Sequence, residues 1–203
     1  MIKRTLFVLL LAGLMFAPAE LFAQKAYKAN IGGYDRIILD MSETGVGIGM
    51  PADAITNIPK VGATLVTAEA NNQMYEKLEI APRNMGGTNA SPQLVATPPG
   101  AKLNWEDGDA RCRGLNYNGV GGWRLPTHRE MTMIWIFRNA LIDLGSTPFT
   151  PDIYWTATES IVTLPPHLPP EDFSFSFNFG GSGGGGGANN RSTYYIRCVR
   201  ETL

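Results

Sequence analysis

The sequence has 203 residues, of which 44% are hydrophobic and 17% are charged, so it can build the core of one ordinary domain or two small ones. Its 23 glycines and 14 prolines indicate a loop-rich chain and argue against a helical bundle or a coiled coil. The net charge of −1 argues against a nucleic-acid-binding protein, and two histidines with two cysteines nearly exclude a zinc site unless carboxylates supply most ligands.

The first 23 residues have the pattern of a signal peptide. Lys3 and Arg4 give a positive start, and the apolar run at residues 6–17 is shorter than the roughly 20 residues of a membrane-spanning helix. Cleavage is plausible near Ala19 or after Ala23, and we favour Ala23. We therefore expect a secreted or cell-surface protein with no membrane span after signal removal. A buried N-terminal helix is the alternative interpretation.

Residues 24–99 form a small β-rich N-terminal region in our interpretation. Short apolar or alternating runs predict strands at residues 36–41, 45–50, 63–66 and 75–81, separated by glycine and proline breaks. We expect this region to accompany a main domain at residues 100–203.

The main domain begins with a predicted helix. Asn104 can cap a helix that starts at Trp105 and ends by Gly114. Glu106 and Asp107 fall in its first turn, where the helix dipole favours carboxylates.

A second helix is predicted from Thr127, because Thr127 and Glu130 match the S/T-x-x-E capping box. An apolar stripe extends it, at spacings of three and four residues, through Met131, Ile134, Trp135, Leu141 and Ile142. Such a helix is buried on most sides or presents a patch to a partner, and we favour burial.

Three strands are predicted after the helices, at residues 154–159, 173–179 and 194–200. In the middle one, phenylalanines alternate with serine and asparagine, so four rings should share one face. The proline-rich stretch at 164–170 predicts a stiff loop, and the glycines at 180–187 predict a flexible connector.

Cys112 and Cys198 are the two cysteines of the chain. Outside the cytosol, a lone pair most simply forms a disulfide, which here would tie the first helix to the last strand. Two free thiols and a redox pair are the alternatives, although redox cysteines usually lie close in sequence.

Four blocks in order carry a resemblance to a known family: Trp105…Ala110-x-Cys112, Gly122-Trp123-Arg124-Leu125-Pro126-Thr127…Glu130, Tyr154-Trp155-Thr156-Ala157-Thr158-Glu159 and Tyr195-Ile196-Arg197-Cys198-Val199-Arg200. With these blocks, residues 100–203 resemble the family that includes the C-terminal domain of the Legionella collagen-like adhesin. They are also similar to the Fibrobacter succinogenes major paralogous domain. The resemblance implies an α+β, C-type lectin-like fold, with two helices packed on short antiparallel strands and a helix-to-last-strand disulfide.

The tryptophan-rich blocks predict a structural motif rather than a ligand site. Trp123 is a large apolar anchor, Arg124 can bind loop carbonyls, Pro126 sets the entry to the helix and Thr127 caps it. The complete predicted motif is Trp105, Trp123, Arg124, Pro126, Thr127, Glu130 and Trp155.

Signals for catalysis are weak, so we expect neither an enzyme nor a cofactor. The G-x-S-x-G match at residues 180–184 is not followed by a helical pattern, and His128 and His167 have no evident base or metal partner. The calcium-binding E-P-N, Q-P-D and W-N-D signatures of sugar-binding C-type lectins are absent. W-R-L-P-T also occurs in sulfatase-modifying enzymes, but these rely on a catalytic cysteine pair, and both cysteines here match structural positions.

We therefore expect an exported, non-catalytic surface module that binds a glycan or a protein through loops at residues 116–121, 147–153 and 164–172. The candidate contacts are Asn116, Tyr117, Asn118, Asp152 and His167. A structural or tip subunit of a bacterial surface appendage, which binds other subunits, is the alternative. A sulfatase-modifying type of enzyme is the third.

Overall fold

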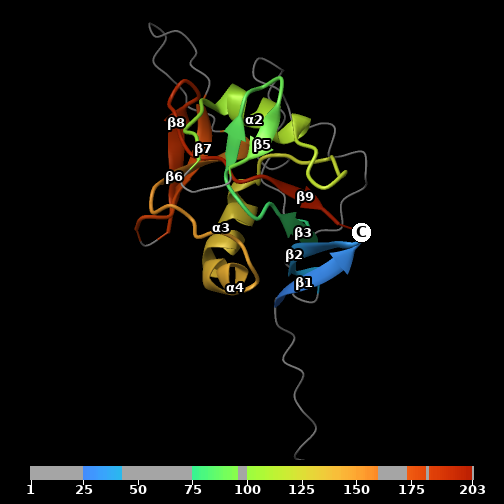
Figure 1. Cartoon of the computed structure of the whole chain (residues 1–203). Coiled ribbons are helices and arrows are strands. Elements are labelled where there is room, and N and C mark those ends of the chain that lie inside the picture. Colours follow the sequence, from blue (N-terminus) through green and yellow to red (C-terminus); the bar gives the residue numbers. More distant parts are fainter. Residues whose placement is uncertain (1–24, 43–74, 96–99, 160–172, 182, 203) are drawn as a thin grey trace, which may run out of the picture.

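The computed structural model describes residues 25–42, 75–95, 100–159, 173–181 and 183–202. Three helices and three antiparallel sheets lie in these ranges (Figure 1), which confirms the α+β class. The strands are β1 (Lys25–Ile31), β2 (Tyr34–Asp40), β3 (Lys77–Ile80), β4 (Met85–Gly87), β5 (Pro92–Leu94), β6 (Ile153–Glu159), β7 (Phe173–Asn178), β8 (Gly185–Asn189) and β9 (Val199–Glu201), and the helices are α2 (Trp105–Gly114), α3 (His128–Ile136) and α4 (Arg138–Asp143). The predicted signal peptide, the predicted strands at 45–50 and 63–66, and the proline-rich loop lie outside the described residues.

The first sheet has the order β1-β2-β3-β9, so it joins the two ends of the described chain. A two-residue turn at Gly32 and Gly33, both with positive φ, connects β1 to β2, as the twist of a hairpin favours. In the centre of the sheet, β3 pairs with β2 on one side and with β9 on the other, where Ile80 lies opposite Val199. The sheet therefore continues across the predicted boundary between residues 99 and 100.

The second large sheet has the order β6-β7-β8 and lies across the molecule from the first (Figure 1). Helix α3 lies between the two sheets, because its apolar side chains pack into one core with both of them. This core contains Ile37, Leu39, Leu78 and Ile80 of the first sheet, Met131, Met133 and Ile134 of α3, and Tyr154 and Phe177 of the second sheet.

A second core surrounds the three buried tryptophans Trp105, Trp123 and Trp155. Each indole N–H donates to a backbone carbonyl: Trp105 to Thr156 at 2.8 Å, Trp123 to Val120 at 2.9 Å and Trp155 to Leu103 at 2.9 Å. A buried indole needs such a partner, so these rings fix the loops that they contact as well as filling space.

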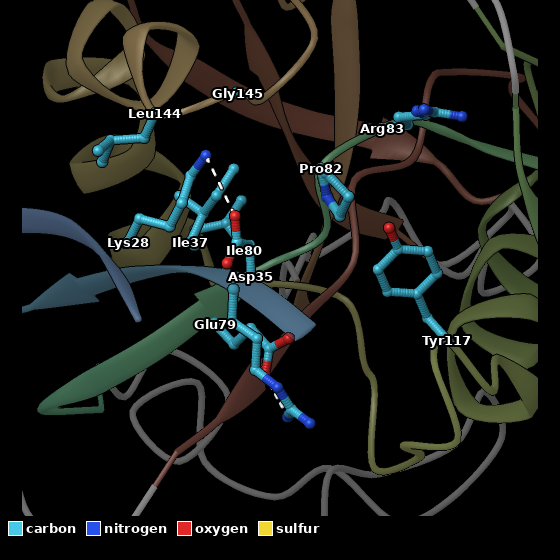
Figure 2. Close-up of a pocket in the computed structure, with 11 residues that line it drawn as sticks. Lys28, Asp35, Ile37, Glu79, Ile80, Pro82, Arg83, Tyr117, Leu144 and Gly145 are labelled. Atoms are coloured by element: carbon cyan, nitrogen blue, oxygen red, sulfur yellow. Dashed lines mark hydrogen bonds and ion pairs between the residues drawn. The ribbon is translucent and has the colours of Figure 1, made fainter. Parts of the chain in front are cut away.

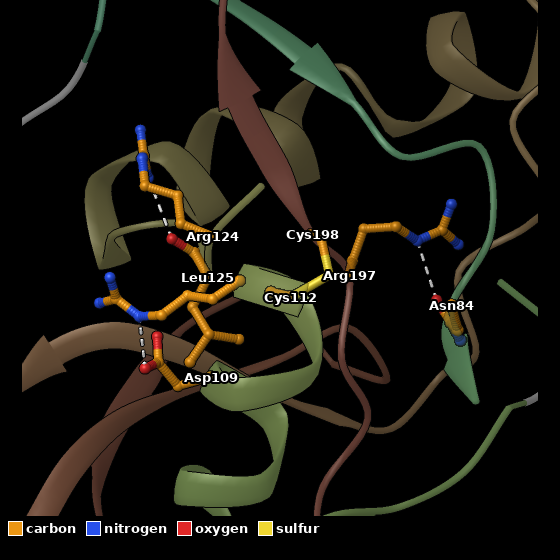
Figure 3. The surroundings of a disulfide bond; sticks show 8 residues. Asn84, Asp109, Cys112, Arg124, Leu125, Arg197 and Cys198 are labelled. Atoms are coloured by element: carbon orange, nitrogen blue, oxygen red, sulfur yellow. Dashed lines mark hydrogen bonds and ion pairs between the residues drawn. A yellow bond between two sulfur atoms is a disulfide. The ribbon is translucent and has the colours of Figure 1, made fainter. Parts of the chain in front are cut away.

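The predicted disulfide is confirmed. Cys112 of α2 and Cys198, next to β9, are bonded across a separation of 86 residues, with their Cα atoms 5.6 Å apart (Figure 3). Both cysteines are fully buried in the tryptophan core.

The two predicted helix starts are also confirmed. The Asn104 side chain accepts a hydrogen bond from the Asp107 N–H at 2.8 Å, and α2 ends at Gly114 as expected. At α3, Thr127 Oγ1 accepts from the Glu130 N–H at 3.3 Å, and Glu130 Oε2 accepts from the Thr127 N–H at 2.8 Å.

The long helix predicted through residue 142 is wrong, because it is divided into α3 and α4. Phe137 leaves helical geometry, with φ −90° and ψ 4°, and α4 starts at the next residue. The break redirects the chain so that Leu141 still reaches the first core. Apolar spacing alone could not show it, because the stripe continues across the bend.

Two other local predictions need correction. The glycine-rich connector includes strand β8, because β7 offers a ladder that even glycines can complete. The closing strand is shorter than predicted, since Tyr194 and Tyr195 form isolated bridges with Leu103 and Tyr154 before β9 begins. The phenylalanine strand is confirmed as β7, but Ser174 and Ser176 are buried as well, so both of its faces are covered.

An ion pair lies fully inside the protein between Arg124 and Glu130. Arg124 Nη1 and Nη2 donate to the two carboxylate oxygens at 2.7 and 2.8 Å, and the Tyr75 N–H donates to the same carboxylate at 3.3 Å. Burial works against the charge of Arg124, but Glu130 outweighs it and raises the Arg124 pKa above its ordinary value. The sequence predicted carbonyl contacts for Arg124, and the Leu125 carbonyl accepts one at 3.0 Å. The capping carboxylate is its main partner.

Arg197 is a second fully buried arginine, and it is held by neutral oxygens. Its Nε donates to Asn84 Oδ1 at 2.8 Å (Figure 3). Its Nη1 donates to Ser146 Oγ at 2.9 Å. The guanidinium also lies over the Phe149 ring, 4.2 Å from its centroid. Burial lowers the pKa of Arg197 to about 10, so the side chain remains charged at neutral pH.

Removing the disulfide should destabilise the fold strongly. We expect Cys112→Ala/Cys198→Ala to lower the free energy of unfolding by about 4–5 kcal/mol, because the unfolded chain regains the entropy of an 86-residue loop. Urea unfolding of the oxidised wild type and the variant measures the difference. A loss below about 1 kcal/mol would contradict the bridge's role in stability.

Breaking the buried ion pair should cost more than losing a cap. Glu130→Gln leaves the Arg124 charge buried without a counter-ion, so we expect a loss of about 3–5 kcal/mol in urea unfolding. Thr127→Ala removes the side-chain cap and should cost about 1 kcal/mol. Glu106→Gln, which alters an exposed first-turn carboxylate of α2, is the matched control and should cost less than about 1 kcal/mol. Equal losses in all three variants would contradict this ranking.

Mild acid should destabilise the fold through His128. Burial lowers the pKa of this imidazole, whose ring lies against Phe175 and Phe177 at 5.2 and 5.6 Å between centroids. As the pH falls below the ordinary value of 6.5, the unfolded chain binds the proton first, so the free energy of unfolding should fall. Urea unfolding at pH 7.5 and 5.5 measures this change. His128→Gln should reduce the difference in the free energy of unfolding between the two pH values. An unchanged difference in this variant would count against His128 as its source.

Candidate functional site

A polar pocket of about 180 Å³ opens where the N-terminal strands meet the main domain (Figure 2). Strands β1 to β3 supply one wall, and Pro82 and Arg83, the loop after α2 and the turn after α4 supply the rest. The lining residues are Lys28, Asp35, Arg36, Ile37, Glu79, Ile80, Pro82, Arg83, Tyr117, Leu144 and Gly145. We call this site the polar pocket.

The floor of the polar pocket holds a neutralised carboxylate. Glu79 is 4% exposed and accepts from Arg36 Nη1 at 3.2 Å and from Arg200 Nε at 2.6 Å. Two guanidinium groups therefore face one carboxylate, which leaves this cluster with a net positive charge. Lys28 and Asp35 form a looser pair at 3.8 Å on the exposed surface of β1 and β2, where an ion pair has little strength.

Two polar groups at the rim are available to a ligand. Arg83 is exposed, and its guanidinium makes no hydrogen bond or ion pair within the described residues. The Tyr117 hydroxyl also has no hydrogen-bond partner among the described residues. Figure 2 shows the Tyr117 side chain reaching toward Pro82 and Arg83. Together they offer guanidinium and hydroxyl donors beside an aromatic ring, which suits a ligand with exposed oxygen acceptors.

Tyr117 is held in place before any ligand arrives. Its backbone N–H and C=O both bond to Val120, at 3.0 and 3.1 Å, around a turn in which Asn118 and Gly119 have positive φ. Its ring lies edge-on to Trp123, with 6.4 Å between ring centroids. Such prior ordering reduces the entropy that binding would otherwise cost.

The structure brings some predicted contacts to this site and separates others. Tyr117 lines the polar pocket, and Asn116 and Asn118 are exposed on the same loop. Asp152 is not among the lining residues. It pairs with Lys102 at 2.7 Å, and this hydrogen bond lowers the Asp152 pKa. His167 and the predicted contact loop at 164–172 lie outside the described residues.

Part of the predicted contact segment at 147–153 has an internal role. The Thr147 carbonyl accepts from Arg197 at 3.3 Å, Phe149 stacks on Phe179 at 4.6 Å, and the Thr150 N–H donates to the Tyr154 hydroxyl at 2.8 Å. These contacts hold the segment against the core.

The predicted structural motif lies behind the lining of the polar pocket, which it meets where Trp123 packs against Tyr117. All seven of its residues are buried, and none of them lines the pocket. Besides the contacts already described, the Pro126 carbonyl accepts from the Ala157 N–H at 2.7 Å, which joins the α3 entry to β6.

Sequence reasoning missed Lys28, Arg36, Glu79 and Arg83 as site residues. Arg36 and Glu79 lie on the strands predicted at residues 36–41 and 75–81, whereas β1, which carries Lys28, was not predicted as a strand. Nothing local indicates that these strands pack beside Tyr117. The available signal was the alternation around residue 79, which places a carboxylate on one face of a short strand.

The described residues show no arrangement for metal or serine chemistry. Within these ranges, no three His, Cys, Asp or Glu side chains lie close enough to hold a metal ion. The G-x-S-x-G stretch leads into strand β8 rather than into the helix that a nucleophilic serine requires, and Ser182 itself lies outside the described residues. No helix in the described part of the chain is long and apolar enough to cross a membrane.

Comparison with known proteins gives a match to a family model. No curated protein sequence matches the chain. The family model of the Lcl C-terminal domain matches residues 81–200, from the residue after β3 into β9, and so covers more than half of the sequence. It includes Arg83 and Tyr117 of the polar pocket but excludes β1, β2 and β3. The chain therefore belongs to the Lcl C-terminal domain family, whose name and resemblance to the Legionella collagen-like adhesin indicate a bacterial surface module related to adhesins.

Proposed function

We propose that this chain is an exported, non-catalytic adhesion module that binds a glycan or a protein ligand in the polar pocket. The main support is the pair of available donors, Arg83 and Tyr117, at the rim of a concave site. Family membership supports a surface role, and the pattern of residues 1–23 supports export.

The scaffold that we propose for this module is C-type lectin-like. Three features support it: a disulfide from the first helix to the last strand, a sheet that pairs β3 with β9, and a second sheet across the core. In such a scaffold a rigid core supports loops that can vary in sequence, which suits recognition.

The buried network explains how the pocket keeps its shape. Arg36 and Arg200 hold Glu79 beneath the pocket, and Trp123 supports Tyr117 at its rim. The pocket walls come from regions far apart in sequence, so their arrangement depends on the first sheet and on the disulfide-linked core.

Binding should depend on Arg83. We expect the mature chain, residues 24–203, to bind at least one ligand on an array of glycans and matrix proteins. Arg83→Ala should weaken that binding about 10- to 100-fold, because a hydrogen bond to a charged group contributes about 1.5–3 kcal/mol. Tyr117→Phe, which removes only the hydroxyl, should weaken it by a smaller factor.

Arg191→Ala is the matched control, since Arg191 is exposed and does not line the pocket. The Arg191→Ala variant should bind the same ligand with the affinity of the wild type. We also expect binding to persist in EDTA, because the calcium signatures of sugar-binding lectins are absent from the sequence. Failure to bind any array member, or equal binding by Arg83→Ala and the wild type, would contradict the proposal.

A further inference from the structure

Strand β8 is the edge of the sheet β6-β7-β8 and lies at the outer flank of the molecule (Figure 1). Its sequence is Gly-Gly-Gly-Ala-Asn, so most of its length has no side chain. Edge strands expose a row of backbone donors and acceptors that another strand can pair with.

The ladder register shows which backbone groups face outward. The Asn178 N–H donates to the Gly184 carbonyl at 2.8 Å, which makes these opposite residues a hydrogen-bonded pair. Hydrogen-bonded and non-bonded pairs alternate along an antiparallel ladder. Gly185 and Gly187, opposite Phe177 and Phe175, therefore point their N–H and C=O groups away from β7. In the described part of the chain, neither residue has a backbone partner on that outer side.

Some of the neighbouring glycines are required by the fold. A Cβ at Gly183 would lie 2.7 Å from Cε2 of Trp135, and one at Gly185 would collide with Nε2 of His128. These two glycines let the hairpin lie directly on the side chains of α3.

Gly181, Gly184 and Gly186 have no such reason to be glycine. A Cβ at any of them would meet nothing within 4 Å, and none has a positive φ. They line a trough of about 390 Å³ with Ile153, Ser176 and Asn178, which we call the glycine trough. Its two polar side chains fold back on the hairpin, because Ser176 donates to the Gly186 carbonyl and Asn178 accepts from the Gly180 N–H. The bare backbone is thus left open to close approach.

The other outer strands of the two large sheets are covered or charged. The outer side of β9 pairs with Arg124, through N–H···O bonds of 2.8 and 2.9 Å between Arg124 and Val199. The outer side of β6 pairs with Tyr195, and β1 carries Lys25 and Lys28. Charged side chains oppose edge pairing, and β8 has none.

We propose that β8 binds an extended peptide segment of a partner protein as an added strand of the sheet β6-β7-β8. The backbone of the peptide bonds to the N–H and C=O groups of Gly185 and Gly187, and its apolar side chains enter the glycine trough beside Ile153. This site is separate from the polar pocket, and it gives the chain a way to join a surface assembly.

A second copy of the chain is a poorer occupant. Two β8 strands would place glycine against glycine, so hydrogen bonds would form with almost no side-chain burial, and such a pair of strands is marginal in water. A peptide with side chains supplies the missing apolar contact.

A random peptide library displayed on phage, selected on the immobilised mature chain, tests the proposal. We expect enriched peptides with alternating apolar residues. Gly187→Pro removes one outward N–H without touching the ladder to β7, and Gly186→Leu fills the trough, so each should weaken peptide binding at least tenfold. Thermal melting of both variants checks that they fold, and binding of the peptide should slow hydrogen exchange at the Gly185 and Gly187 amides of the wild type.

Arg83→Ala separates this proposal from the polar pocket, because it should leave peptide binding unchanged. Gly121→Pro is the control for the effect of proline, because Gly121 is exposed and a Cβ there would meet no atom within 4 Å. This variant should bind the peptide as the wild type does. The proposal is overturned if no peptide is enriched over the bare support, or if folded Gly187→Pro and Gly186→Leu bind as the wild type does. Self-association of the wild type in sedimentation, lost in Gly187→Pro, would instead assign the edge to a second copy.

Discussion

The buried carboxylate of Glu130 is the contact on which the arrangement of this protein depends most. It caps α3 through the Thr127 N–H, neutralises Arg124, and accepts from the Tyr75 N–H. Arg124 in turn pairs through its backbone with Val199 on β9. One side chain therefore joins the N-terminal region, the tryptophan-containing loop, a central helix and the closing strand. Each partner compensates the cost of burying that charge, so the loss of any one affects the others.

The disulfide stabilises the same arrangement of elements at a second place. It fixes α2 to the segment just before β9, while the neighbouring Arg197 draws Asn84 and the loop at Ser146 and Thr147 inward. Trp123 and Glu79, which support the polar pocket, are both buried. The edge of β8 lies outside this arrangement and presents mainly backbone. The same scaffold thus carries two surfaces of different chemistry, the polar pocket with its charged side chains and the uncharged edge of β8.

Several elements could be predicted because their signals are short-ranged. Asn104 and Thr127 each determine a helix start through bonds that span three residues. The helix break at Phe137 could not be found in this way, because an apolar stripe looks the same whether the helix is straight or bent. Strand β8 was hidden for a related reason: glycine has no preference for a strand, and only the neighbouring β7 makes it one.

By itself, the sequence determined the α+β class, both helix caps, the cysteine pair and the family, since each rests on residue types at fixed local spacing or in a fixed order. Tertiary structure alone decided that Lys28, Glu79, Arg83 and Tyr117 meet around one pocket, and that Arg124 pairs with the capping carboxylate. The physical reason is the register of the first sheet and the packing of distant segments onto it. These place side chains more than a hundred positions apart within reach of one another, as the bond between Arg200 and Glu79 shows.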